Sequence, residues 1–359
     1  MALDELTLRN FRSFRECRFR PDPDAVTVLL SPNGTGKTSI LESIYALATA
    51  GSFRTTTASD MIRTHEELAE VHGVLIQHGR RMQIDLTLHR GERNTTKRML
   101  VNGQRPTSRT ELSQVLPLTV FTPEGVDVIR QGPDHRRTLL TNLLTDVAPH
   151  LGEVVERFAK VLQQRNALLR SLQGVRPTPS QRDELDVWNI EFIAAADHLI
   201  SARVTLLHDL APLVTHFYQE LAQNTFSVST NYEYSWSESL PSALMRSLEE
   251  DVRRGYTTVG PHRDDINFQL DGRDARRQAS QGEQRSLALA VRLAGHDLVQ
   301  QQRGITPLLL LDDVFSELDP VRSDRLLQLL PVGQTLVTTA SPLPEAMSPT
   351  MIVDVTLVS

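Results

Sequence analysis

The segment spanning residues 26–38 constrains the fold of this chain more than any other stretch. Residues 26–30 are apolar and largely β-branched, as in a short buried strand. Gly34 and Gly36 follow in a loop that ends at Lys37-Thr38, and apolar residues then recur at helical spacing. In this order, strand, glycine-rich loop and helix allow backbone N–H groups to surround a phosphate at a helix N-terminus. The segment therefore predicts a nucleotide-binding loop.

The side chains of this loop have separate expected roles. Lys37 would reach the β- and γ-phosphates of ATP, and the Thr38 hydroxyl would hold Mg²⁺. The pattern G-x-x-x-x-G-K-[ST] has glycine where this chain has Ser31, so we expect the turn to be built differently there. An ordinary βα turn with a surface lysine is the weaker interpretation in this context. The predicted ATP contacts are Ser31, Pro32, Asn33, Gly34, Thr35, Gly36, Lys37 and Thr38.

Length and composition set the class of protein. A chain of 359 residues suggests two domains, or one large domain with an insertion. The longest apolar runs, such as 307–311, are too short to span a bilayer, and the start of the chain lacks the apolar core of a signal peptide. A single cysteine, Cys17, excludes an internal disulfide. We therefore expect a cytoplasmic protein, whose net charge of −6 confines nucleic-acid contacts to local basic patches.

The N-terminal third has β character. Residues 71–76, 82–88, 97–101 and 115–121 read as strands, and Asn102-Gly103 is a strong turn signal. They predict an antiparallel β-lobe attached to the nucleotide-binding sheet. Residues 3–20 alternate apolar side chains with arginines. They fit either an amphipathic strand or hairpin with solvated charges, or a basic strip facing the nucleotide or a polyanion; these arginines are Arg9, Arg12, Arg15, Arg18 and Arg20.

The middle of the chain has helical periodicity. Apolar residues recur at helical spacing from 134 to about 173 and again from 188 to 221, and a proline-rich breaker lies at 176–179. We expect two long helices in an antiparallel arm, each of roughly 35 residues and about 50 Å. Core helices of a compact all-α domain are the alternative. The expected domains are a helical arm, 134–254, and a split head formed by 1–133 and 255–359.

Two further segments carry candidate chemistry. The leucine run 308–311 reads as a buried strand that ends at Asp312-Asp313, and an acid at such a tip holds Mg²⁺ in P-loop enzymes, here together with Thr38. Ser280 and Glu283 form an S-x-x-E capping box, which leaves Gln281 and Gly282 exposing backbone at the mouth of a helix. The candidate catalytic residues from this pattern are Lys37 and Asp312.

Charged residues elsewhere give weaker indications. Arg136 and Arg137 lie in the first turn of a predicted helix, where cations oppose the helix dipole, so they indicate a negative partner. Lys97 and Arg98 form a second local pair of cations. His262 precedes two aspartates in the segment 260–265, but a charged turn explains this spacing better than a metal site does.

Several motifs resemble known families. SPNGTGKT, SQGEQ and LLLLDDVFSELD resemble, in order and spacing, the Walker A, signature and Walker B/D-loop segments of ABC-type ATPases. FRSF and the helical insertion resemble the structural-maintenance-of-chromosomes branch. LRNFRSF, the Arg136-Arg137 pair, GPHRDD and ASQGEQRSLALAVRLA are similar to blocks of the RecF family. The expected fold is therefore α/β, an ABC-type P-loop ATPase head with an antiparallel β-lobe and an inserted helical arm.

The resemblance implies a function. It implies an ATP-dependent homodimer that binds gapped DNA or single-strand/double-strand junctions in DNA repair and replication-fork maintenance. The candidate DNA contacts are the local cations Lys97, Arg98, Arg136 and Arg137. It further implies partners RecR and RecO in loading the RecA recombinase. Each signature segment would complete the ATP site of the partner subunit through Ser280, Gln281 and Gly282. Asp313 would join Lys37 and Asp312 as a catalytic residue.

Three departures predict slow hydrolysis: Asp313 replaces the usual glutamate, Thr338 and Thr339 stand where a switch histidine is expected, and the loop after 115–121 has no obvious glutamine. The resemblance implies that DNA stimulates this weak ATPase.

Two rival functions fit part of the pattern. A transporter-type ABC subunit would have a compact helical subdomain between Walker A and signature, instead of a β-lobe followed by a long arm. A structural DNA clamp would use nucleotide only to hold its fold, and measured ATP turnover with intact DNA binding would exclude it.

Overall fold

The computed structural model describes residues 1–77, 79–92, 94–106, 109–174, 178–340, 347 and 349–355. By their contacts the residues form two compact units. The first unit comprises Met1–Gly125, Glu220–Asn224 and Leu289–Ser359, and the second comprises Val126–Gln219 and Thr225–Ala288. No helix in the described ranges is long and apolar enough to cross a membrane.

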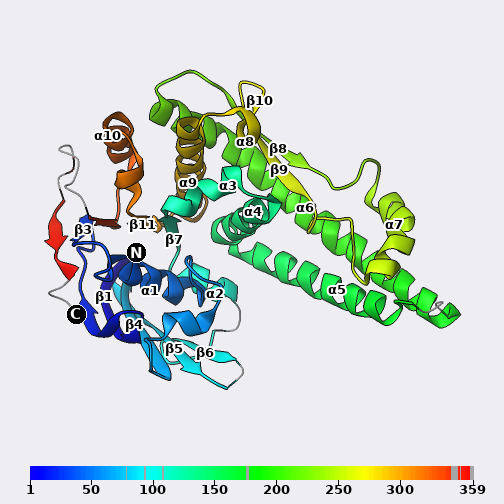
Figure 1. The fold of residues 1–359 in the computed structure, drawn as a ribbon, viewed down its shortest axis with the longest axis horizontal. Coiled ribbons are helices and arrows are strands. Elements are labelled where there is room, and N and C mark those ends of the chain that lie inside the picture. The colour runs from blue at the N-terminus through cyan, green and yellow to red at the C-terminus, as the bar shows by residue number, and fades with distance from the viewer. Residues whose placement is uncertain are drawn as a thin grey trace. The chain divides into compact units, whose positions relative to one another are not determined.

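A parallel five-stranded sheet carries the nucleotide loop of the first unit (Figure 1). Its order is β13-β3-β12-β11-β7, so the central strands come from distant parts of the sequence. Because the strands are parallel, their carboxyl ends meet at one edge of the sheet, where Asp312 lies opposite Thr338. The strands are β3 (Val26–Leu30), β7 (Leu118–Phe121), β11 (Leu308–Asp312), β12 (Thr335–Thr339) and β13 (Met351–Val353).

The predicted β-lobe is a second, antiparallel sheet in the order β2-β1-β4-β5-β6. The predicted strands 71–76, 82–88 and 97–101 are confirmed, each within a longer strand. The predicted strand 115–121 is partly wrong, because helix α2 (Arg109–Val115) occupies its start and β7 begins only at Leu118. The strands are β1 (Ala2–Phe11), β2 (Phe14–Phe19), β4 (Leu68–Gln77), β5 (Arg80–Arg90) and β6 (Thr95–Val101).

The turn at Asn102-Gly103 is confirmed by its backbone. Both residues have positive φ, 49° and 80°, as a type I′ turn requires. The turn returns the chain so that Val101 forms a bridge with Gln104 instead of connecting two named strands.

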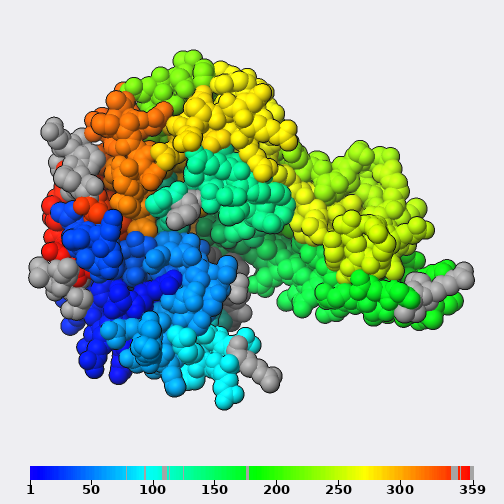
Figure 2. Space-filling view, viewed as in Figure 1, coloured from blue at the N-terminus to red at the C-terminus, as the bar shows by residue number. Residues whose placement is uncertain are grey.

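Helix α1 (Lys37–Thr49) lies in the core shared by both sheets. Its apolar side chains are almost completely buried, together with residues of β1, β3 and β11. Gly73 of β4 allows this close packing, since a Cβ there would lie 2.6 Å from Leu47 Cδ1. In the space-filling view the blue-to-cyan part of the chain forms one continuous mass (Figure 2). The phosphate loop therefore precedes a helix that is fixed on both sides.

The second unit combines helices with a small antiparallel sheet in the order β10-β9-β8. The sequence missed β8, which lies within the range expected to be helical. Residues 255–288, expected to belong to the head, also pack in this unit. Its elements are α3 (Asp127–Arg130), α4 (Pro133–Val147), α5 (Gly152–Ser171), α6 (Pro179–Ala222), β8 (Val228–Glu233), α7 (Leu240–Arg254), β9 (Asp265–Leu270), β10 (Arg273–Asp274), α8 (Ala275–Gln278) and the start of α9 (Gln281–Arg303). In the first unit α10 (Pro320–Leu329) completes the fold.

The long helical insertion is confirmed, but its two helices differ in length. Helix α5 has 20 residues and α6 has 44, which spans roughly 66 Å. Arg157 pairs with Glu191 and Arg165 bonds to Asn189, so the two helices run antiparallel (Figure 1). The chain leaves α4 at Val147, just before Pro149. Arg176 and Pro177, part of the predicted breaker, lie outside the described residues.

A buried ion pair holds the second unit together. Arg165 on α5 is 0% exposed and donates to Asp251 on α7 (2.9 Å) and to Thr257 Oγ1 (2.6 Å). Its guanidinium also lies 5.6 Å from the ring centre of Phe192 on α6. Removing one partner of such a pair typically costs about 3–5 kcal/mol, which is a large part of the net free energy of unfolding of a domain.

Candidate nucleotide site

The glycines of the loop are required by its backbone. Gly34 and Gly36 have φ of 85° and 105°, values that side chains disfavour. A Cβ on Gly36 would lie 2.6 Å from the Phe14 ring, so this position has neither conformational nor steric room for another residue. Gly36 is the N-cap of α1 and offers no side chain to cap the helix. The first N–H groups of α1 thus remain available to an anion.

Ser31, the departure from the usual pattern, anchors the start of the loop. Its hydroxyl lies 2.7 Å from Asp354 Oδ1 and 2.6 Å from the Leu30 carbonyl oxygen as possible acceptors. The same oxygen accepts the Val355 N–H at 2.9 Å. Ser31 is 5% exposed, so these bonds are shielded from water. The serine therefore connects the phosphate loop to the chain that follows β13, a contact that glycine could not make.

Lys37 lies folded over the loop. Its ammonium group donates to the carbonyl oxygens of Ser31 and of Pro32, the latter at 2.8 Å. Burial lowers the pKa of Lys37, and the charges of Asp313 and Asp312 partly offset that effect. The lysine thus places a desolvated positive charge beside the carbonyls that border the loop.

Asp312 and Thr38 meet as predicted. The Thr38 hydroxyl donates to Asp312 Oδ1 at 2.8 Å, and the Thr338 hydroxyl donates to the same atom at 2.7 Å. Burial raises the pKa of Asp312, while the bonds from Thr338 and Thr38 and the charge of Arg54 lower it. A buried carboxylate and a hydroxyl at this spacing fit Mg²⁺, which binds few protein oxygens and completes its shell with water and phosphate.

Asp313 follows with an unusual backbone. Its φ is 49°, in the left-handed region, and its N–H donates to Thr338 Oγ1 at 3.0 Å. Aspartate tolerates this conformation better than most residues. Thr338, at the position where a histidine was expected, therefore bonds to both carboxylate residues of the strand tip.

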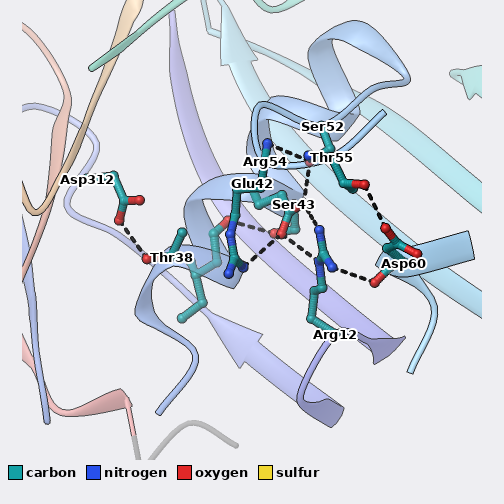
Figure 3. Close-up of polar contacts among 10 residues, drawn as sticks. Arg12, Thr38, Glu42, Ser43, Ser52, Arg54, Thr55, Asp60 and Asp312 are labelled. Atoms are coloured by element: carbon teal, nitrogen blue, oxygen red, sulfur yellow. Dashed lines mark hydrogen bonds and ion pairs between the residues drawn. The ribbon is translucent and has the colours of Figure 1, made fainter. Parts of the chain in front are cut away.

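An ion-pair network behind the loop was missed by the sequence analysis (Figure 3). Glu42 of α1 is completely buried, and Arg12 Nε donates to it at 2.8 Å. Ser52 Oγ (2.5 Å) and Arg54 Nη1 (3.4 Å) bond to the same carboxylate. The network ties the segment after α1 to the helix and brings the charge of Arg54 within reach of Asp312. The sequence signal that could have predicted this network is Glu42, a glutamate among the apolar residues of a buried helix face.

The arginines of residues 3–20 are largely paired within the protein. Arg12 binds Glu42, Arg18 and Arg20 bind Glu5, and Arg9 lies 3.6 Å from Glu70. The hydrogen bonds from Arg18 and Arg20 are the chief cause that lowers the pKa of the Glu5 carboxyl to about 2. These contacts favour the interpretation as a hairpin with paired charges over a free basic strip.

The predicted capping box is confirmed in the second unit. The Ser280 N–H donates to Glu283 Oε2 at 2.7 Å, and the Glu283 N–H donates to Ser280 Oγ at 3.3 Å. Gln284 fixes the helix from its buried side, because its amide donates to the Ala275 carbonyl at 3.0 Å and accepts from Arg130 Nε at 2.8 Å. Ser280 and Gln281 remain exposed at the helix mouth.

The segment 260–265 has a structural role. Asp264 is buried and accepts from the Tyr232 hydroxyl (2.7 Å) and the Ser235 N–H (2.8 Å). Asp265 pairs with Arg136, and His262 Nε2 lies 2.9 Å from the Thr257 carbonyl. Among the residues that the structure describes, no three His, Cys, Asp or Glu side chains gather as a metal site.

The four candidate DNA contacts differ in availability. Arg136 is 3% exposed and gives both edges of its guanidinium to Asp265 and to backbone carbonyls. Arg137 bonds to the Asp264 carbonyl at 2.7 Å and to Asp134. These two arginines therefore stabilise the second unit. Lys97 and Arg98 lie exposed on edge strand β6, although Lys97 also donates to the Ala50 carbonyl at 2.6 Å.

A parallel sheet with a phosphate loop, a carboxylate beside the Thr38 hydroxyl and a capped signature helix define an ABC-type P-loop ATPase. Residues 2–347 match the family model described as "RecF/RecN/SMC N terminal domain". The chain is 36% identical over 354 residues to the DNA replication and repair protein RecF of Acidothermus cellulolyticus, covering 95% of this chain and 94% of that protein. It is 33% identical to the RecF of Heliobacterium modesticaldum, covering 92% and 89%. The chain belongs to the RecF family.

Solved structures agree with this assignment. A structure of the recombination mediator protein RecF-ATP in the RecFOR pathway superposes with a TM-score of 0.87 at 25% identity, covering 98% of this chain and 94% of that one. An Smc head bound to the C-terminal winged-helix domain of ScpA superposes with a TM-score of 0.54 at 17% identity, covering 95% and 90%, and shows the shared head fold.

Proposed function

We propose that this protein is an ATP-dependent recombination mediator that closes into a homodimer when it binds ATP. One observation carries the proposal: the chain has a complete phosphate loop in its first unit and a capped, exposed signature helix mouth in its second. The names of its relatives, a DNA replication and repair protein and a recombination mediator, support the setting in DNA repair and replication-fork maintenance.

The residues of the loop have defined tasks toward ATP. The N–H groups of the loop and of the start of α1 would bind the phosphates, and Lys37 would move from the Ser31 and Pro32 carbonyls to the β- and γ-phosphates. Thr38 and Asp312 would hold Mg²⁺, which neutralises charge that develops on the phosphates. Asp313 would orient the attacking water. Its side chain is short, so hydrolysis is slow.

The signature helix would act on a second copy of the chain. The Ser280 hydroxyl and the N–H groups of Gln281 and Gly282 would bind the γ-phosphate of the partner's ATP. The capping box makes this approach feasible because Glu283 turns its carboxylate back toward the Ser280 N–H. ATP would then be shared across the interface, and its hydrolysis would open the dimer.

Membership of the family supports a proposal for the DNA and protein partners. We propose that the dimer binds gapped DNA or single-strand/double-strand junctions, acts with RecR and RecO in the cytoplasm, and helps to load the RecA recombinase. DNA would stimulate a weak ATPase. Lys97 and Arg98 are the remaining candidates for phosphate contacts, since Arg136 and Arg137 are held by the second unit.

The test compares association with and without ATP. Sedimentation and light scattering of the wild type should show a dimer only with ATP. The dimer should bind gapped DNA and should hydrolyse ATP at a measurable rate. Ser280→Arg should retain ATP binding but lose the dimer, because it blocks the helix mouth. Ser237→Arg, a substitution at another exposed serine of the second unit, is the control. Equal dimerisation of Ser280→Arg would contradict the proposal, and DNA binding without turnover would favour a structural clamp.

A further inference from the structure

The signature helix mouth contains a negative charge where the proposed function requires an anion to bind. Glu283 lies in the first turn of α9, and its side chain is 22% exposed. Its bond from the Ser280 N–H is the chief cause that lowers the pKa of Glu283, so the carboxylate is ionised at neutral pH. A carboxylate beside an incoming γ-phosphate would repel it, because like charges brought together at an interface cost binding energy.

Arg273 on β10 lies next to this carboxylate. Its Nη2 is 3.4 Å from Glu283 Oε1, the oxygen other than the one that accepts the Ser280 N–H. The Arg273 guanidinium also lies 5.5 Å from the ring centre of Phe226. A cation over an aromatic ring is attracted to its face, which restricts the arginine to this side of the helix mouth. Glu283 therefore has one oxygen for the cap and the other for a positive charge.

The pair is not needed to hold the helix in place. Gln284 already attaches α9 to α8 through the Ala275 and Arg276 carbonyls and to α3 through Arg130. Arg273 is 44% exposed, and an ion pair so accessible to water adds little to stability. The remaining effect of Arg273 is on the electrostatic potential at the N-terminus of α9, where a single charge changes which ligands can bind.

We propose that Arg273 is a positioning residue of the signature site: it neutralises Glu283, so that this carboxylate can cap α9 without repelling the γ-phosphate of ATP bound to a second copy of the chain. This inference rests on the ATP-dependent dimer of the proposed function. Arg273 acts through Glu283. Glu283 caps the helix, and Arg273 neutralises the charge of that carboxylate.

The test is a double-mutant comparison of the ATP-dependent dimer. Arg273→Gln should weaken dimerisation by about tenfold, since it leaves Glu283 uncompensated. Glu283→Gln should dimerise like the wild type, because glutamine can also complete a capping box. The combined variant should regain near wild-type dimerisation, since no carboxylate then needs neutralising. The defect of Arg273→Gln should also shrink at high salt, which screens exposed charges.

Controls separate this role from others. Arg246→Gln removes an exposed, paired arginine of the same unit and should leave the dimer unchanged. ATP affinity and melting temperature should match the wild type in every variant. If the combined variant dimerises as weakly as Arg273→Gln, Arg273 contacts the phosphate directly and the inference is overturned. If Arg273→Gln dimerises like the wild type, the inference is overturned and the proposed function is not. A wild type that stays monomeric with ATP would overturn the proposed function and this inference together.

Discussion

At the scale of the residue, the strand tip of β11 places two carboxylates in different surroundings. Asp312 is buried and accepts two hydroxyl bonds, which suits a metal ligand. Asp313 is partly exposed, and its left-handed backbone sets the direction of a side chain one methylene shorter than glutamate. A displacement of about 1 Å in a reacting group can cost roughly a hundredfold in rate. Slow hydrolysis would follow from this geometry.

Replacing Asp313 tests its task directly. Asp313→Asn removes the negative charge but keeps a residue that tolerates positive φ, so the backbone should not change. The variant should bind ATP and dimerise, while single-turnover hydrolysis falls by at least tenfold and the dimer fails to reopen. Hydrolysis at the wild-type rate would assign the water to another carboxylate such as Glu317, or Glu124, whose side chain lies outside the described residues.

At the scale of the element, the sequence predicted those features that depend on residues close together in the chain. The strand, loop and helix of residues 26–49 depend on neighbours in the chain, and the capping box from Ser280 to Glu283 spans only four residues. Partners that meet across the fold were not predictable in this way. Arg12 and Glu42 are 30 residues apart and Ser31 and Asp354 are 323 apart, so neither pair leaves a periodic signal. Strand β8 was missed because Val228 is its only buried residue, so the strand has no run or alternation of apolar side chains.

Helix α9 provides a prediction about pH. His296 of α9 is 1% exposed, its Nδ1 lies 3.2 Å from Thr119 Oγ1 of β7, and its Nε2 has no hydrogen-bond partner among the described residues. Burial lowers the pKa of His296 from 6.5 to about 4. Between these values the unfolded chain binds the proton and the folded chain does not. His296 therefore reduces the free energy of unfolding as pH falls from about 6.5 to about 4, by up to ~3 kcal/mol.

Urea unfolding at pH 7 and at pH 4.5 checks this. Buried carboxyls with raised pKa values, such as Asp312 and Asp264, act in the opposite direction, so the comparison is between variants. His296→Gln should lose about 2 kcal/mol less than the wild type on acidification. His208→Gln, at a histidine whose side chain is 87% exposed, is the control and should follow the wild type. Parallel curves for all three proteins would show that His296 does not titrate in this range.

At the scale of the whole molecule, the total charge of −6 requires that any DNA contact be local. Most arginines named in the sequence analysis proved to have partners within their own unit, which sequence spacing could not show. Arg136, for example, pairs with Asp265, 129 residues away. The exposed pair Lys97 and Arg98 on edge strand β6 is what remains of the predicted DNA contacts.

The salt dependence of DNA binding tests this pair. Removing one cation that binds a phosphate should reduce the slope of log affinity against log salt by about 0.9 on duplex DNA. Lys97→Glu combined with Arg98→Glu should therefore weaken binding and flatten the slope by nearly two units. The exchange Lys97→Arg with Arg98→Lys preserves both charges and should preserve the slope. Unchanged binding by the charge-reversed variant would place the DNA path elsewhere.

The pairing of β3 between β12 and β13 has a consequence for synthesis of the protein. Residues 26–30 leave the ribosome early, but both neighbouring strands, and the Asp354 that bonds to Ser31, come some three hundred residues later. At 5–20 residues per second this interval is roughly 15–60 s. Throughout it the strand that leads into the phosphate loop is apolar and unpaired. Until β12 and β13 are made, this unpaired apolar strand therefore makes the nascent chain prone to aggregation.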